Sequence, residues 1–201
     1  MEFFESHWFM FAKITCRCGA CGFEIKDDQP SLSLLCGCTD CREALEWCAK
    51  KGGLEPVSLP ELIYVKSDIV YTFGLEFMQA FQLRHNARST RVYCKQCFSV
   101  IGVDHKSYRD NVFMFFKDHC VTTCDLSIKP SAAIYLNELK DTNQISNLKN
   151  IPLIMSFSKK ETQQFRSIKA VSGSFNEIKR PRYGQTLKSV IKSISKIQIL
   201  N

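Results

Sequence analysis

Cysteines are the residues of this sequence whose type and spacing most plainly indicate chemistry. There are 11 of them in 201 residues, and seven fall into three closely spaced groups. These groups are Cys16 and Cys18; Cys36, Cys38 and Cys41; and Cys94 and Cys97. The start of the sequence lacks the features of a secretory signal, so we expect an intracellular reducing compartment, the cytoplasm first, where disulfides are rare. The spacing therefore indicates metal ligands rather than a disulfide framework.

The first and last groups together can supply the four soft ligands of a tetrahedral zinc ion. Residues two apart in a strand point to the same side, so Cys16 and Cys18 can share one ion. Cys94 and Cys97 have the C-x-x-C spacing that places two ligands in one turn. A shared ion would join distant parts of the chain, and its binding energy would become folding energy. The alternative is that all four are buried free thiols.

The middle group offers three neighbouring cysteines and no evident fourth ligand. Three protein ligands with one open position are typical of a catalytic rather than a structural zinc. Cys41 stands at the start of a predicted helix, whose N-terminal partial charge favours the thiolate. A substrate thiol could take the open position. The alternative is a vestigial or purely structural site, closed by Cys21 or by another side chain.

The remaining cysteines and the histidines carry weaker signals. Cys48 follows Cys41 by seven residues and is expected on the same helical face as a small, buried apolar residue. His119, Cys120 and Cys124 form only a loose group that could bind a metal or be redox-active. We assign no general acid or base, and no catalytic residue beyond the metal ligands.

The elements that must position these cysteines are mostly short strands. Apolar, aromatic and β-branched runs alternate with short polar breaks, which predicts an antiparallel β-architecture. The predicted strands are Trp8–Thr15, Leu32–Leu35, Leu62–Val65, Ile69–Phe73, Ala80–Leu83, Thr90–Tyr93, Val100–Val103 and Val112–Phe116. The segment Cys41–Lys50 is rich in helix formers, so we expect a short helix there with Asp40 as its N-cap. A loop is predicted from Gly53 to Pro60.

The positive charge of the chain is concentrated in its C-terminal third. Residues 1–125 have 14 Lys and Arg against 16 Asp and Glu, whereas residues 126–201 have 13 against 4. Such an imbalance predicts an acidic protein, nucleic acid or an anionic membrane face as a partner, or simply a solvated basic extension. No stretch is long and apolar enough to predict a transmembrane segment.

The composition also divides the chain into two units. After Phe157, Lys, Ser, Gln and Ile become frequent. We therefore expect a zinc-binding domain over residues 12–157 and a basic, partly helical extension over residues 158–201. The stretch Gln185–Leu200 predicts an amphipathic helix that docks on the domain or on a partner.

In order and spacing, the three cysteine groups resemble those of the glutathione-dependent formaldehyde-activating enzyme family, which includes centromere protein V. The matching motifs are Cys16-Arg-Cys18-Gly-Ala20, Cys36-x-Cys38-x-x-Cys41-Arg42 and Arg91-x-Tyr93-Cys94-x-x-Cys97. Two later segments, Lys129–Tyr135 and Ile151-Pro-Leu, look like the closing strand and the terminal Leu-Pro element of that family. The likeness covers roughly residues 12–157.

This resemblance implies a mainly β fold, a β-tent similar to the Mss4-like architecture, with antiparallel sheets and one short helix after the middle cysteines. It implies a structural zinc on Cys16, Cys18, Cys94 and Cys97, and a second zinc on Cys36, Cys38 and Cys41 that a glutathione thiol can approach. The family activity joins formaldehyde to glutathione to give S-(hydroxymethyl)glutathione and is classed as a carbon–sulfur lyase. Zinc would serve as Lewis acid and thiolate holder.

The sequence departs from the family pattern at three places, which leaves the choice of substrate open. The sequence does not indicate the oligomeric state either. Phe98 stands where the family usually has Gly, Gly37 replaces a common His, and the tryptophan expected shortly after Ile134-Tyr135 is missing. The alternative function is a catalytically silent, zinc-stabilised subunit of a larger assembly, which binds its partner through the basic extension. An iron–sulfur protein is a third alternative, although no run of four cluster ligands occurs.

Overall fold

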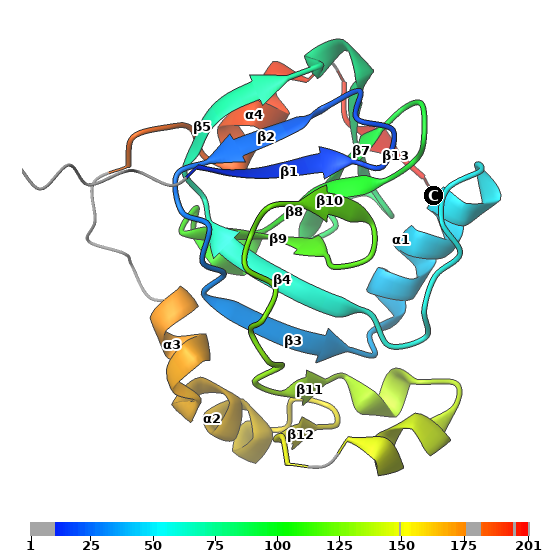
Figure 1. Ribbon diagram of the computed structural model, residues 1–201. Coiled ribbons are helices and arrows are strands. Elements are labelled where there is room, and N and C mark those ends of the chain that lie inside the picture. The colour runs from blue at the N-terminus through cyan, green and yellow to red at the C-terminus, as the bar shows by residue number, and fades with distance from the viewer. Residues whose placement is uncertain (1–10, 149, 176–181, 195, 201) are drawn as a thin grey trace, which may run out of the picture.

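The computed structural model describes residues 11–148, 150–175, 182–194 and 196–200 (Figure 1). This part of the chain is mainly β, with 13 strands in two sheets and four α-helices. The predicted fold class is confirmed at that level. The strand predicted to begin at Trp8 is described from Ala12 onward, and Trp8–Met10 lie outside the described residues. Among the helices that are described, none has the length and apolar content needed to cross a bilayer.

The smaller sheet has four antiparallel strands in the order β10-β1-β2-β5. They are β1 (Ala12–Cys16), β2 (Gly22–Ile25), β5 (Ile69–Phe73) and β10 (Cys120–Thr122). The apolar pattern predicts β1 and β5 but misses β2 and β10. Both missed strands are short, and β2 starts with Gly22 and contains Glu24, so the pairing with β1 and not local propensity makes them strands. On the outer face Glu24 forms an ion pair of 3.2 Å with Lys13.

The larger sheet has nine strands in the order β12-β11-β3-β4-β9-β8-β7-β6-β13. They are β3 (Leu32–Cys36), β4 (Glu61–Lys66), β6 (Met78–Gln82), β7 (Ser89–Cys94), β8 (Val100–His105), β9 (Val112–Phe116), β11 (Ala133–Ile134), β12 (Leu153–Ile154) and β13 (Gln198–Ile199). The six central strands match predicted runs and pair antiparallel. The three short outer strands pair parallel, which the sequence does not predict.

The central strands are continuous apolar runs because the larger sheet is buried on both faces. Along β9, Phe113 and Phe115 face the core between the two sheets, which we name the inter-sheet core. Met114 and Phe116 face the core on the other side of the larger sheet, against helix α1 (Thr39–Lys50), which we name the helix-side core. In the inter-sheet core the ring of Phe23 from β2 meets that of Phe113 edge-on, with centroids 6.0 Å apart. Each of the two faces of the larger sheet is therefore covered by its own hydrophobic core.

The C-terminal extension packs on the rest of the chain instead of standing apart from it. Its helices are α2 (Lys159–Ser167), α3 (Lys169–Phe175) and α4 (Leu187–Ser193). Val171 of α3 joins the helix-side core, while Leu187 and Val190 of α4 join the inter-sheet core. The amphipathic terminal helix thus docks on the domain. It is shorter than the predicted Gln185–Leu200, because Gln198–Ile199 pairs as a strand with the otherwise free edge of β6.

A buried carboxylate, that of Asp68, holds the segment just before α4. Oδ1 of Asp68 accepts hydrogen bonds from the backbone N–H groups of Tyr183, at 2.9 Å, and Gly184, at 2.6 Å. Lys66 adds an ion pair of 3.3 Å. Burial alone would raise the pKa of Asp68, but these N–H donors and the Lys66 ammonium lower it below its ordinary value. Asp68 is therefore ionised at neutral pH and ties the extension to the turn between β4 and β5.

Candidate metal centres

Four cysteines from the two sheets meet at one point, and we name them the four-cysteine cluster. Cys16 ends β1 and Cys18 follows in the turn, while Cys94 ends β7 and Cys97 lies in the turn before β8. The Sγ atoms of all four lie within 4.8 Å of one another. Those of Cys16 and Cys18 are 3.5 Å apart, and those of Cys18 and Cys94 are 3.8 Å apart. The set is the one that the spacing predicts.

Backbone and hydroxyl donors support these sulfurs. The N–H of Gln96 lies 3.4 Å from Sγ of Cys94, as expected for a C-x-x-C turn that offers N–H groups to its sulfurs. Oγ of Ser99 lies 3.2 Å from Sγ of Cys97. Burial alone would raise the pKa of Cys97, but the Ser99 hydroxyl and N–H lower it to about 6. This turn is therefore built to hold a thiolate, the form of cysteine that binds metals.

Cys21 lies beside the four-cysteine cluster, not beside the middle cysteines. Its N–H lies 3.4 Å from Sγ of Cys16, and its thiol is buried. Burial, followed by the neighbouring Cys16 and Cys94, raises its pKa far above the ordinary value. The suggestion that Cys21 closes the middle group is therefore wrong, because the turn after β1 returns Cys21 to the first cluster.

Cys36, Cys38 and Cys41 form the three-cysteine cluster, with their Sγ atoms within 4.8 Å of one another. Cys36 is the last residue of β3, Cys38 precedes α1, and Cys41 lies in its first turn. Cys36 and Cys41 are buried, whereas Cys38 is half-buried. No fourth Cys, His, Asp or Glu from the described ranges joins this set within the same distance.

The sequence predicts Asp40 as the N-cap of α1, and this prediction is wrong because Cys38 is the N-cap. Sγ of Cys38 accepts a hydrogen bond of 3.3 Å from the N–H of Cys41, and the helix begins at Thr39. The sulfur thus takes the place that a carboxylate or hydroxyl oxygen usually fills. Asp40 instead turns outward, where its Oδ1 accepts a hydrogen bond of 3.0 Å from Nη1 of Arg84.

The thiols of the three-cysteine cluster act on one another electrostatically. Hydrogen bonds from the Cys36 and Cys41 thiols, then the Cys41 N–H and the charge of Arg91, lower the pKa of Cys38 to about 3. The Cys38 and Cys41 thiols, together with burial, raise the pKa of Cys36 well above its ordinary value. Of the three thiols, the half-buried Cys38 therefore has the environment that most favours a thiolate, the form of cysteine that binds metals.

The loop that carries these cysteines is held from two sides. The N–H of Gly37 donates a 2.9 Å hydrogen bond to the carbonyl oxygen of Ile134 in β11. The N–H of Thr39 donates one of 2.7 Å to Oε2 of Glu138. A Cβ atom on residue 37 would lie 2.8 Å from Cγ of Leu139, so only glycine fits there. The histidine common in the resembling family therefore has no room at this position.

The positions of the sulfurs fit a thiolate-binding metal such as zinc. In a tetrahedral site with Zn–S bonds of about 2.3 Å, neighbouring sulfurs are about 3.8 Å apart. The measured separations in the four-cysteine cluster, 3.5 and 3.8 Å, are close to that value. Soft sulfur donors favour zinc or copper(I) over magnesium or calcium. Both clusters can therefore hold a metal ion, the first with a complete ligand set and the second with three ligands.

Two tyrosines and one arginine lie close enough to the three-cysteine cluster to sense its charge. The hydroxyl of Tyr108 donates a hydrogen bond of 3.3 Å to that of Tyr64. Burial is the main cause that raises the pKa of both, and the Cys36 and Cys41 thiols raise them further. Arg91 is 2% exposed and lowers the pKa of Cys38. Arginine is seldom fully buried, so Arg91 inside the predicted strand Thr90–Tyr93 is a signal that sequence reasoning could have used.

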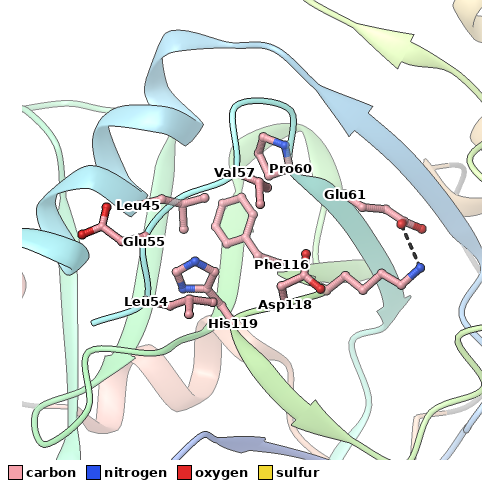
Figure 2. A pocket seen from close by; sticks show the side chains of 10 residues that line it. Leu45, Leu54, Glu55, Val57, Pro60, Glu61, Phe116, Asp118 and His119 are labelled. Atoms are coloured by element: carbon pink, nitrogen blue, oxygen red, sulfur yellow. Dashed lines mark hydrogen bonds and ion pairs between the residues drawn. The ribbon is translucent and has the colours of Figure 1, made fainter. Parts of the chain in front are cut away.

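His119 and its neighbours form no ligand set. His119, Cys120 and Cys124 are not among the described groups whose ligand atoms converge. His119 lines a cavity of about 10 Å³ beside Leu45 and Phe116 (Figure 2), which is room for one water molecule and not for a substrate. Burial lowers its pKa to about 4, so the ring is neutral at pH 7. Cys48 is fully buried in the helix-side core, as predicted.

Comparison with known proteins adds no assignment. No protein-family model matches the chain, and no curated protein sequence matches it. The functional conclusion therefore depends on the geometry of the two clusters.

Proposed function

We propose that this chain is a zinc-dependent enzyme of the carbon–sulfur lyase type, acting on an adduct of glutathione or a similar small thiol such as S-(hydroxymethyl)glutathione. The three-cysteine cluster is the observation that carries this proposal. Its thiols converge on one point, and no fourth side chain from the described part of the chain completes the set. A divalent cation bound there has a coordination position for a ligand from outside.

We further propose that the chain is a distant relative of the formaldehyde-activating family and has its β-tent fold. The order of the seven cysteines supports this proposal. So does their placement, because one pair comes from each sheet and the middle group opens the helix that covers the larger sheet. Within this proposal residues 12–157 are the zinc-binding domain, and residues 158–201 are an addition that packs on it.

The chemistry of the proposed reaction is the making or breaking of one carbon–sulfur bond. A thiolate sulfur attacks the carbonyl carbon of formaldehyde, the C=O π bond opens onto oxygen, and the thiol proton ends on the new hydroxyl group. The reverse step breaks the same bond, and no electrons are exchanged with a redox partner. Zinc, when bound to the three cysteines, supplies a Lewis acid that favours the thiolate form of a substrate thiol near neutral pH.

The residues around the three-cysteine cluster have different roles in this proposal. Cys36 and Cys41 form the buried side of the cluster, and Cys38 forms the side that a substrate can reach. Tyr64 and Tyr108 keep their protons at neutral pH because burial raises their pKa values, so this hydrogen-bonded pair stays neutral beside the cluster and is a poor source of a proton for the product oxygen. Gly37 keeps the loop tight against Leu139, which narrows the approach on that side.

The alternative of a silent assembly subunit has less support. The apolar face of α4 is already buried on the domain and is not free for a partner. Lys188, Lys192 and Lys196 stay exposed, so an acidic protein or nucleic acid can still bind this surface in addition to any catalytic role.

The proposal is tested by following glutathione and formaldehyde at equilibrium with two-dimensional exchange NMR, which detects their interconversion with the adduct. We expect the zinc-loaded chain to accelerate exchange. The variant Cys38→Ser should lose the acceleration, while the control Cys124→Ala, whose thiol lies outside both clusters, should keep it. A zinc-loaded wild-type chain that leaves the exchange of glutathione and of other small thiols at the uncatalysed rate would rule out the lyase function.

A further inference from the structure

Arg91 occupies an unusual position for a charged residue. It lies in the middle of β7, in register with Phe81 of β6 on one side and Val103 of β8 on the other. Its side chain is 2% exposed, and its Cζ lies 5.9 Å from the centre of the Phe81 ring. An arginine this deep in an apolar layer is costly unless an opposite charge compensates it.

The described residues do not supply that compensation as an ordinary ion pair. Nη2 of Arg91 donates a 3.1 Å hydrogen bond to the carbonyl oxygen of Asp40, which lies between Cys38 and Cys41. Nε and Nη1 have no hydrogen-bond partner within the described chain, and no carboxylate there pairs with the guanidinium. The carboxylate of Asp40 is turned to the surface and pairs with Arg84 instead.

The groups that can supply the negative charge are the thiols of the three-cysteine cluster. The guanidinium donates a hydrogen bond to the backbone of their loop at Asp40, the residue between Cys38 and Cys41. Both of these cluster thiols lie close enough to sense its positive charge.

We infer that Arg91 is the built-in counter-ion of the three-cysteine cluster and sets its affinity for a divalent cation. This inference rests on the proposed second metal centre. A divalent cation with three thiolates carries a net charge of minus one, and the guanidinium brings the buried unit to zero. A neutral fourth ligand then leaves it uncharged, whereas without Arg91 the unit would keep an uncompensated charge in an apolar layer.

The four-cysteine cluster shows why only the second centre needs such a residue. A divalent cation with four thiolates carries minus two, but Cys18 is exposed and Cys97 half-buried, so water screens that charge. In the three-cysteine cluster two of the three sulfurs are buried. Arg91 therefore acts as a positioning and charge-balancing residue and not as one that reacts.

Cobalt(II) titration tests the inference, because its sulfur-to-metal charge-transfer absorption reports each thiolate-bound ion without any turnover. For the wild type we expect two ions per chain. Arg91→Met keeps the side-chain length and removes the charge. It should lower the affinity of the three-cysteine cluster for its ion by about 10-fold or more, while the four-cysteine cluster binds its ion as before. Arg91→Lys restores the charge without the planar fork and should recover much of the loss.

Arg84→Met is the matched control, because Arg84 contacts the same Asp40 through its exposed carboxylate, and it should bind both ions as the wild type does. The first ion reports correct folding of each variant. Should Arg91→Met fold poorly, Arg91→Gln, which also lacks the charge, takes its place: an affinity for the second ion equal to that of Arg91→Lys contradicts the inference.

The inference would also be overturned if Arg91→Met bound both ions as tightly as the wild type does, or if the wild type bound only one ion. A wild type that binds two ions yet has no lyase activity would reject the proposed function and leave the role of Arg91 standing.

Discussion

The Sγ atoms of Cys18 and Cys94 lie 3.8 Å apart although 76 positions separate the two residues in the sequence. Cys18 follows a strand of the smaller sheet, and Cys94 ends a strand of the larger one. A metal ion held by the four-cysteine cluster would therefore fasten the two layers that enclose the inter-sheet core. Its binding free energy would be part of the free energy of folding.

Removal of one ligand of this cluster should destabilise the whole domain. We expect Cys94→Ser to lower the free energy of unfolding by about 4 kcal/mol or more, since loss of a structural metal is among the largest single-residue effects. That corresponds to a fall in Tm of roughly 10 °C. Calorimetry with and without a chelator checks this, with Cys124→Ala as the control. A chelator that leaves the wild-type Tm unchanged would contradict it.

Cys38 has two roles that substitutions can separate. Serine can accept the N–H of Cys41 and so keep the helix cap, but it is a poorer ligand for zinc; alanine can do neither. We expect Cys38→Ser to unfold near the wild-type Tm with one metal ion per chain. Cys38→Ala also loses the helix cap, so its free energy of unfolding should be about 1 kcal/mol lower than that of Cys38→Ser. Denaturant unfolding and elemental analysis measure the two effects. Two retained ions in Cys38→Ser would exclude Cys38 as a ligand.

Asp68 should make the docking of α4 depend on pH. Its folded pKa is lowered, so its stabilisation is fully present above the unfolded pKa of about 4 and is lost as the pH falls through the folded value. We expect Asp68→Asn to cost about 2 kcal/mol at pH 7, because two N–H groups donate to the carboxylate. The difference between the two proteins in denaturant unfolding should shrink toward pH 2. A pH-independent difference would show that the charge is not involved.

Phe98 should respond to substitution in an unusual order. Its φ is 53°, a left-handed conformation that costs about 1 kcal/mol for a residue with a Cβ. Its ring stacks on Tyr93 with centroids 5.9 Å apart and meets Trp47 edge-on at 6.3 Å. Glycine and alanine both lose this packing, but only glycine relieves the strain, so Phe98→Gly should be more stable than Phe98→Ala by about 1 kcal/mol. Thermal unfolding of the pair checks this, and the reverse order would contradict it.

Apolar runs predict the central strands of the larger sheet because those strands are buried on both faces. The short strands β2, β10 and β13 are not predictable in this way, since each exists through pairing with a neighbour that the local sequence does not reveal. For the same reason the end of the predicted helix Gln185–Leu200 is wrong, because the edge of β6 captures Gln198 and Ile199.

Ligand spacing predicts which cysteines come together, because short chelating pairs constrain the local backbone. It does not reveal that a sulfur caps α1 in place of Asp40, since the two candidates stand two residues apart and propensity favours the carboxylate. Nor does it reveal the role of Arg91, which depends on a strand lying beside the loop of the three-cysteine cluster. The ions themselves stay a prediction.

The metal content of the purified chain tests the central claim most directly. Native mass spectrometry of protein prepared without added metal, alongside circular dichroism of the same sample, should show a folded chain with two zinc ions. One ion should leave readily on mild chelation, and the other should leave only as the chain unfolds. A chain that is fully folded and carries no metal would contradict the account.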